Sequence, residues 1–111
     1  MSGAIKTFSK CASLLLLISC LSACGPSQPP KTYTVEIRNM AFVPADITVN
    51  KGDTIKWVNH DMMAHDVTEQ TTKAWSSGPI QADSTWKMAV TDEADYFCSI
   101  HVVMKGKIEL K

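Results

Sequence analysis

The sequence predicts an all-β fold, a sandwich or barrel of about seven to eight short strands. Apolar and polar residues alternate with a period of two over several stretches after residue 31, which is typical of strands with one buried face. Turn-forming residues separate these stretches, and none of them repeats apolar residues at helical spacing. A chain of 111 residues forms one domain at most.

Seven stretches are expected to be strands, because each alternates or lies between turn residues. They cover residues 32–38, 47–50, 54–58, 65–70, 85–90, 95–98 and 107–110. Phe42-Val43-Pro44 is a predicted break, and Lys51-Gly52-Asp53 a predicted tight turn. Residues 71–83 contain Ser-Ser-Gly-Pro and are expected to form a long loop. An antiparallel arrangement of these short strands is the simplest expectation.

The N-terminus predicts export. Lys6 and Lys10 precede a short apolar run that ends in small residues before Cys24, the pattern of a secretory signal peptide over residues 1–23. The run is shorter than the roughly 18–20 apolar residues that span a bilayer. Residues 21–24, Leu-Ser-Ala-Cys, resemble the bacterial lipobox, which implies acylation of Cys24. The alternative is an ordinary cleaved signal with an incidental cysteine.

A lipid on Cys24 would anchor the chain to a membrane without spanning it. Residues 24–31 are rich in proline and predict an extended spacer before a domain over residues 32–111. The expected location is the bacterial periplasm or cell envelope. Lys plus Arg equals Asp plus Glu at 11 each, so no charge imbalance indicates a nucleic-acid partner.

The cysteine count indicates a special role for Cys98. Of four cysteines, Cys11 and Cys20 belong to the predicted signal and Cys24 is the predicted lipidation site. An exported domain with one cysteine has no disulfide framework. Ligation of a metal is one good reason to keep such a thiol.

Cys98, His101 and Met104 stand at positions i, i+3 and i+6 in one predicted loop. Two His, one Cys and a weak axial Met define a blue-copper site, so the loop supplies three of its four ligands. The fourth is expected from the segment 59–67, where His65 is preferred over its rival His60.

The sequence resembles the small cupredoxins of the plastocyanin, pseudoazurin and amicyanin type over essentially all of residues 32–111. The shared motifs are Met40-x-Phe42-x-Pro44, Lys51-Gly52-Asp53-x-Ile55-x-Trp57-x-Asn59, His65, Tyr96-x-Cys98-x-x-His101-x-x-Met104 and Lys105-Gly106-Lys107. The resemblance implies a Greek-key sandwich that carries one type 1 copper ion and transfers electrons. It also implies that His65, Cys98, His101 and Met104 are the copper ligands.

Three positions depart from the family pattern. Ala64 and Ile100 stand where the family often has proline, and Asp66 replaces an Asn that helps to tie the ligand loops together. An ionised Asp66 can accept hydrogen bonds but cannot donate them. A binuclear CuA site would need a second cysteine at position 102, which is Val102, and is therefore excluded.

The sequence favours a monomeric electron carrier with transient redox partners over an enzyme, because protein ligands fill the predicted site. Val102, Val103 and Met63 are the expected docking residues. Copper delivery by the cluster of His60, Met62 and Met63 is one rival. A metal-free or zinc-bearing assembly module with an inert Cys98 is another.

Overall fold

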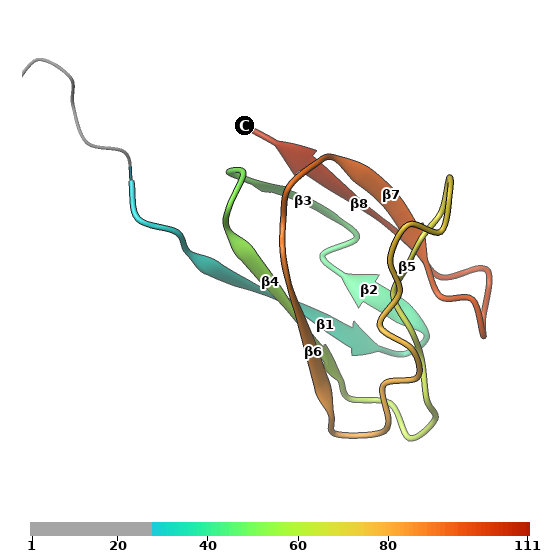
Figure 1. The fold of residues 1–111 in the computed structure, drawn as a ribbon. Coiled ribbons are helices and arrows are strands. Elements are labelled where there is room, and N and C mark those ends of the chain that lie inside the picture. Colours follow the sequence, from blue (N-terminus) through green and yellow to red (C-terminus); the bar gives the residue numbers. More distant parts are fainter. Residues whose placement is uncertain (1–27) are drawn as a thin grey trace, which may run out of the picture.

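The structure is a computed structural model that describes residues 28–111. It contains two four-stranded sheets (Figure 1). The strands are β1 (Thr32–Arg38), β2 (Ala41–Val43), β3 (Asp46–Val49), β4 (Thr54–Asn59), β5 (Thr68–Glu69), β6 (Thr85–Ala89), β7 (Ala94–Phe97) and β8 (Lys105–Leu110). The prediction of an all-β fold is confirmed. The predicted signal peptide and Cys24 lie outside the described residues.

The strand directions correct one expectation. One sheet has the order β2-β1-β4-β6 and the other β3-β8-β7-β5. β1 pairs with β4 in parallel, and β3 pairs with β8 in parallel, so the expectation of a purely antiparallel sandwich was wrong for these two pairs. Alternation in the sequence defines which residues face the core, but it contains no information on strand direction.

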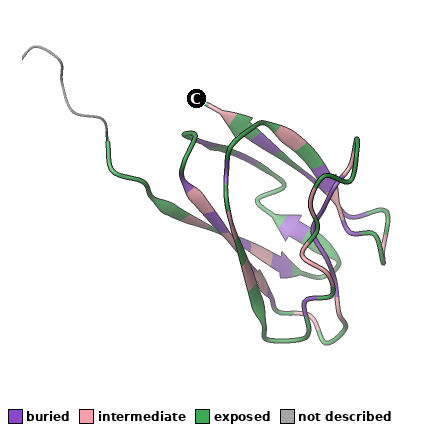
Figure 2. Ribbon diagram, viewed as in Figure 1, coloured by how far each residue is buried: buried purple, intermediate pink, exposed green. Residues whose placement is uncertain are grey.

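The predicted inward faces are confirmed. Val35 and Ile37 on β1 and Ile55 and Trp57 on β4 are fully buried, and buried residues alternate with less buried ones along β4 (Figure 2). Trp57 meets Tyr96 of the opposite sheet, with the indole Nε1 donating a hydrogen bond of 3.3 Å to the Tyr96 hydroxyl. Burial raises the pKa of Tyr96 to about 12, which keeps this hydroxyl neutral in the core.

The β7–β8 hairpin presents the predicted ligand loop. Tyr96 lies opposite Gly106 in the register of the two strands, and a Cβ atom at position 106 would overlap the Tyr96 ring. Only glycine therefore lets the Tyr96 ring approach the β8 backbone this closely. The hairpin closes with Cys98 N donating to Met104 O at 3.0 Å, so the backbone holds these two predicted ligands side by side.

The expected strand over residues 65–70 is shorter in the structure, where β5 covers only Thr68–Glu69. Before β5, His65 forms an isolated antiparallel bridge with Ile80. After β5 the Glu69 carboxylate accepts backbone hydrogen bonds from Thr71 and Thr72, which turns the chain away from the sheet. Within residues 28–111, no helix is long and apolar enough to cross a membrane.

Candidate metal centre

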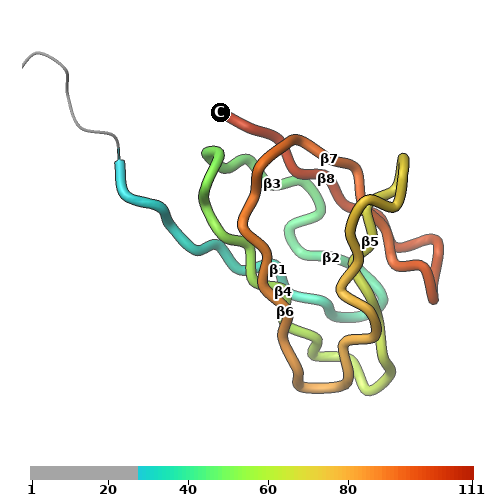
Figure 3. Tube along the Cα trace, viewed as in Figure 1, coloured from blue at the N-terminus to red at the C-terminus, as the bar shows by residue number. Residues whose placement is uncertain are grey.

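Three of the predicted ligands converge beside the β7–β8 loop. The potential ligand atoms of His65, Cys98 and His101 lie within 4.8 Å of one another. Cys98 Sγ is 3.9 Å from His65 Nδ1 and 4.0 Å from His101 Nδ1, and the two Nδ1 atoms are 3.2 Å apart. Figure 3 shows the chain that leads into β5 passing close to the red loop that joins β7 to β8.

Cys98 is fully buried, and two backbone N–H groups donate hydrogen bonds to its sulfur. Asp66 N donates to Sγ at 3.3 Å and His101 N donates at 3.4 Å. Hydrogen bonds from N–H groups stabilise a thiolate, which is the form of cysteine that binds metals. These two donors also come from the two chain segments that carry the histidines.

His65 is fully buried, and Asp61 fixes the orientation of its ring. The Asp61 carboxylate lies 2.9 Å from His65 Nε2. The carboxylate can only accept, so the Nε2 atom carries the proton and the lone pair of Nδ1 faces the sulfur. Burial opposes ionisation of Asp61, but hydrogen bonds from Met40 N and Asn39 N and the His65 ring keep its pKa below the ordinary value.

Asn59 anchors the loop that carries Asp61. Its side-chain amide donates to Met63 O and to Ile80 O, both at 2.9 Å, and its Oδ1 atom accepts from Asp61 N at 2.9 Å. The side chain is buried, and its carbonyl and amide groups bind this loop and the segment around Ile80. Two of these hydrogen bonds hold Asp61 and Met63 in the loop that leads to His65.

His101 and Met104 share one turn of the β7–β8 loop, where Met104 N donates to His101 O at 3.0 Å. The His101 ring packs edge-on against the His65 ring with centroids 4.9 Å apart. His101 is half-buried, whereas Met104 is only 2% exposed. The rival residue His60 lies on the surface and pairs with Glu36 at 3.1 Å, so the structure brings His65 and not His60 to Cys98.

Asp66 joins the two ligand-bearing segments, although it cannot donate as the family Asn does. Its carboxylate accepts a hydrogen bond of 2.7 Å from Ser99 N and a further one from the Ser99 hydroxyl. Ser99 supplies both donors, so the tie between the segments survives the change of residue.

The donor set fits copper. Two imidazole nitrogens and a cysteine sulfur lie together, and a buried methionine thioether follows in the same loop. These are the soft and intermediate ligands of a blue-copper ion. The residues are already gathered by hydrogen bonds of the protein.

The family model of copper binding proteins, plastocyanin/azurin family, matches residues 31–111. The chain belongs to this family. Its cofactor is copper, and the resemblance to small cupredoxins is confirmed.

Two curated relatives support this membership. Amicyanin from Paracoccus versutus is 29% identical over 92 residues, which cover 72% of this chain and 65% of the relative. Plastocyanin from Nostoc punctiforme is 34% identical over 71 residues, which cover 60% of this chain and 51% of the relative. The chain therefore spans less than two thirds of the length of either relative.

Solved structures share the fold. A Cu(I) structure of an amicyanin mutant superposes with a TM-score of 0.67 at 23% identity, covering 72% of this chain and 82% of that chain. A copper-containing nitrite reductase from Thermus scotoductus SA-01 gives the same TM-score of 0.67 at 22% identity, covering 79% of this chain but only 24% of the enzyme. The same sandwich thus occurs alone and as a module of a larger enzyme.

The sequence interpretation missed Asp61 and the side-chain role of Asn59. A signal for Asp61 was present, since a carboxylate four residues before a candidate ligand can reach back to its ring when the intervening chain forms a turn. No spacing rule indicated that Asn59, at the end of β4, would be buried and turn its amide toward the loop.

Proposed function

We propose that this protein is a type 1 copper electron carrier, with His65 Nδ1, Cys98 Sγ, His101 Nδ1 and Met104 Sδ as its ligands. The observation that supports this best is the convergence of the first three donor atoms within 4.8 Å. Met104 follows in the same loop and is buried, and its thioether would be the weak fourth ligand of a bound copper ion.

Copper bound here supplies a one-electron couple between Cu(I) and Cu(II). The residues of the chain supply a site that changes little with oxidation state. Asp61 holds the His65 ring, and the donors Asp66 N and His101 N hold the Cys98 sulfur. Burial of His65, Cys98 and Met104 excludes water, so little solvent has to reorganise when the charge changes.

The half-buried His101 is the proposed route for the electron, and partners dock around it. Val102 is 60% exposed, Val103 is 78% exposed and Met63 is 48% exposed. We propose that these exposed apolar side chains contribute to one contact site for other proteins. A small patch of this kind suits transient redox partners and a monomeric carrier.

We further propose that residues 1–23 direct export, that Cys24 carries a lipid, and that residues 24–31 hold the domain away from the membrane. The support is the order of charge, apolar core and small residues in the sequence. The carrier would then work in the periplasm or cell envelope, confined to a membrane surface.

Copper delivery is the second candidate, and the structure favours it less. Met62 is 95% exposed and His60 is engaged with Glu36, so the two do not form a preorganised site with Met63. A role as an enzyme is also disfavoured, because four protein ligands leave no open position on the metal for a substrate.

The visible spectrum of the Cu(II)-loaded 25–111 fragment tests the proposal. We expect an intense blue thiolate-to-copper band that disappears in Cys98→Ala and in His65→Ala. The matched control His60→Ala should keep the band, because His60 lies on the surface. A pale product with copper bound would exclude a type 1 site and bring copper delivery forward.

A further inference from the structure

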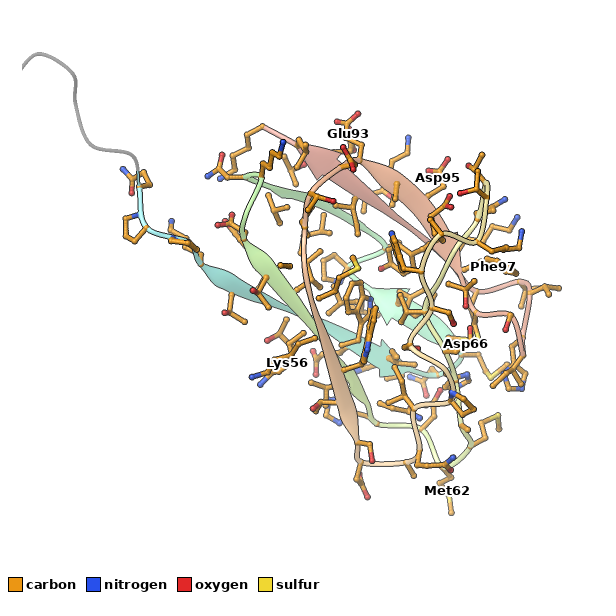
Figure 4. The ribbon with its side chains drawn as sticks, viewed as in Figure 1. Lys56, Met62, Asp66, Glu93, Asp95 and Phe97 are labelled. Atoms are coloured by element: carbon orange, nitrogen blue, oxygen red, sulfur yellow. The ribbon has the colours of Figure 1, made fainter. Side chains whose placement is uncertain are left out.

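The carboxylate of Asp66 is buried beside the metal centre, where it accepts hydrogen bonds from its neighbours. It is 5% exposed. Its Oδ1 atom accepts from Ser99 N at 2.7 Å and from the Thr68 hydroxyl at 3.2 Å, and its Oδ2 atom accepts from the Ser99 hydroxyl. Figure 4 shows Asp66 near the end of β7, close to Phe97. Both carboxylate oxygens of Asp66 are therefore used in hydrogen bonds.

No cation balances the charge of this carboxylate among residues 28–111. The ion pairs of the described domain join Glu36 to Arg38 and His60, and Asp61 to His65. A buried charge without a partner of opposite sign is costly. Asp66 therefore gains from any positive charge that appears nearby.

Asp66 is tied to the metal centre at two points. It directly follows His65, and its own backbone N–H donates to Cys98 Sγ at 3.3 Å. Its carboxylate binds Ser99, the residue after Cys98. A charge placed so close to the ligands acts on the ion mainly through protein and not through bulk water. The effective dielectric constant of protein is about 20.

We propose that Asp66 is a positioning residue whose negative charge favours the Cu(II) state of the centre; the inference rests on the proposed function. With two neutral imidazoles and one thiolate, the centre carries a net charge of +1 when copper is Cu(II) and 0 when it is Cu(I). The carboxylate attracts the first state and is indifferent to the second. At an effective dielectric constant of about 20, a unit charge within roughly 12 Å of the ion changes the Cu(II) to Cu(I) ratio by at least about tenfold.

The loop-tying role and the charge of Asp66 can be separated. In Asp66→Asn, the amide oxygen can still accept from Ser99 N, and the amide nitrogen can donate to the Ser99 hydroxyl. The tie between the two segments is kept while the charge is removed. A residue that only tied the loops would leave the redox equilibrium of this variant unchanged.

The test uses the copper-loaded full chain, equilibrated with a redox mediator at a fixed poise, with the blue absorbance as the measure of Cu(II). Asp66→Asn is expected to lower the Cu(II) to Cu(I) ratio at least about tenfold, and tenfold is about 59 mV for a one-electron couple. In chelator competition, its Cu(II) affinity should fall by the same factor relative to its Cu(I) affinity. The control Asp92→Asn removes an exposed carboxylate from the β6–β7 turn and should change neither ratio.

An unchanged ratio in Asp66→Asn, with a blue wild-type protein, overturns this inference and leaves the proposed function standing. A wild-type protein without the blue band overturns both. If Asp66→Asn does not fold, Ser99→Ala decides the question. This variant keeps the carboxylate and removes one donor from it, so the ratio should rise, and an unchanged ratio overturns the inference.

Discussion

Asp61→Ala tests whether the metal centre is organised by the protein before any ion binds. Asp61 accepts from Asn39 N at 2.7 Å, from Met40 N at 3.0 Å and from the His65 ring at 2.9 Å. The two backbone donors are exposed, so water can replace the lost carboxylate at little cost. His65 is fully buried, and an unsatisfied buried polar group costs about 1–3 kcal/mol.

The strained turn at Asn39 and Met40 adds nothing to this cost, because its backbone conformation is the same in the wild-type chain and the variant. Both residues have left-handed backbone angles, with φ of 53° and 60°, a conformation that costs about 1–2 kcal/mol per residue and needs local support. From the loss of the His65 hydrogen bond we expect Asp61→Ala to lower the free energy of unfolding by about 1–3 kcal/mol, or the melting temperature by roughly 4–24 °C for a domain of this size.

Urea unfolding of the metal-free domain measures this loss, and Cu(II) competition measures its effect on the site. Loss of a carboxylate that orients a ligand histidine typically weakens metal binding 10- to 100-fold. The exposed residue Glu109 provides a control, and Glu109→Ala should change neither quantity. Unfolding and copper affinity like those of the wild-type chain would refute the idea that Asp61 orients His65.

Two further predictions concern the sandwich itself. Gly106→Ala should destabilise the metal-free domain by about 3 kcal/mol or more in urea unfolding, because the new methyl group overlaps the Tyr96 ring between paired strands. Gly78→Ala meets only a left-handed φ of 67° with open space around it, and should cost about 1–2 kcal/mol; equal costs would refute the overlap. Hydrogen bonds from the hydroxyl and N–H of Thr72 lower the pKa of Glu69 to about 2 from 4.5, so the stability contributed by Glu69 is present above pH 4.5 and is lost between pH 4.5 and 2. Acid titrations of unfolding should therefore be less steep in Glu69→Gln, and identical titrations would contradict this assignment.

The sequence could predict the fold class and which strand residues face the core, but it could not predict which strands pair. The alternation around Ile55 and Trp57 placed both side chains in the core, where the structure has them. The parallel pairing of β3 with β8 could not be predicted, since it joins Ile47 to Ile108 across most of the domain. A two-residue period is the same whichever way the neighbouring strand runs.

The site could be predicted where its residues are close in sequence. Cys98 and His101 lie within one loop, so their spacing alone placed them together, and the structure agrees. Only part of the role of Asp66 in joining the two segments could be predicted from the sequence. Its inability to donate was clear from its chemistry, but the compensating donors of Ser99 depend on how two distant segments meet.

The parallel β3–β8 pair has a consequence for the order of events during folding. β8 follows all four proposed ligands in the sequence, and it finds its partner in β3, near the start of the domain. Closing so long a loop is slow compared with forming a local hairpin. The local β7–β8 hairpin can hold Cys98, His101 and Met104, but the pocket also needs the distant segment of His65. A pocket with all four ligands therefore forms in the folded domain and not in the hairpin alone. Copper uptake would therefore report that the fold is complete.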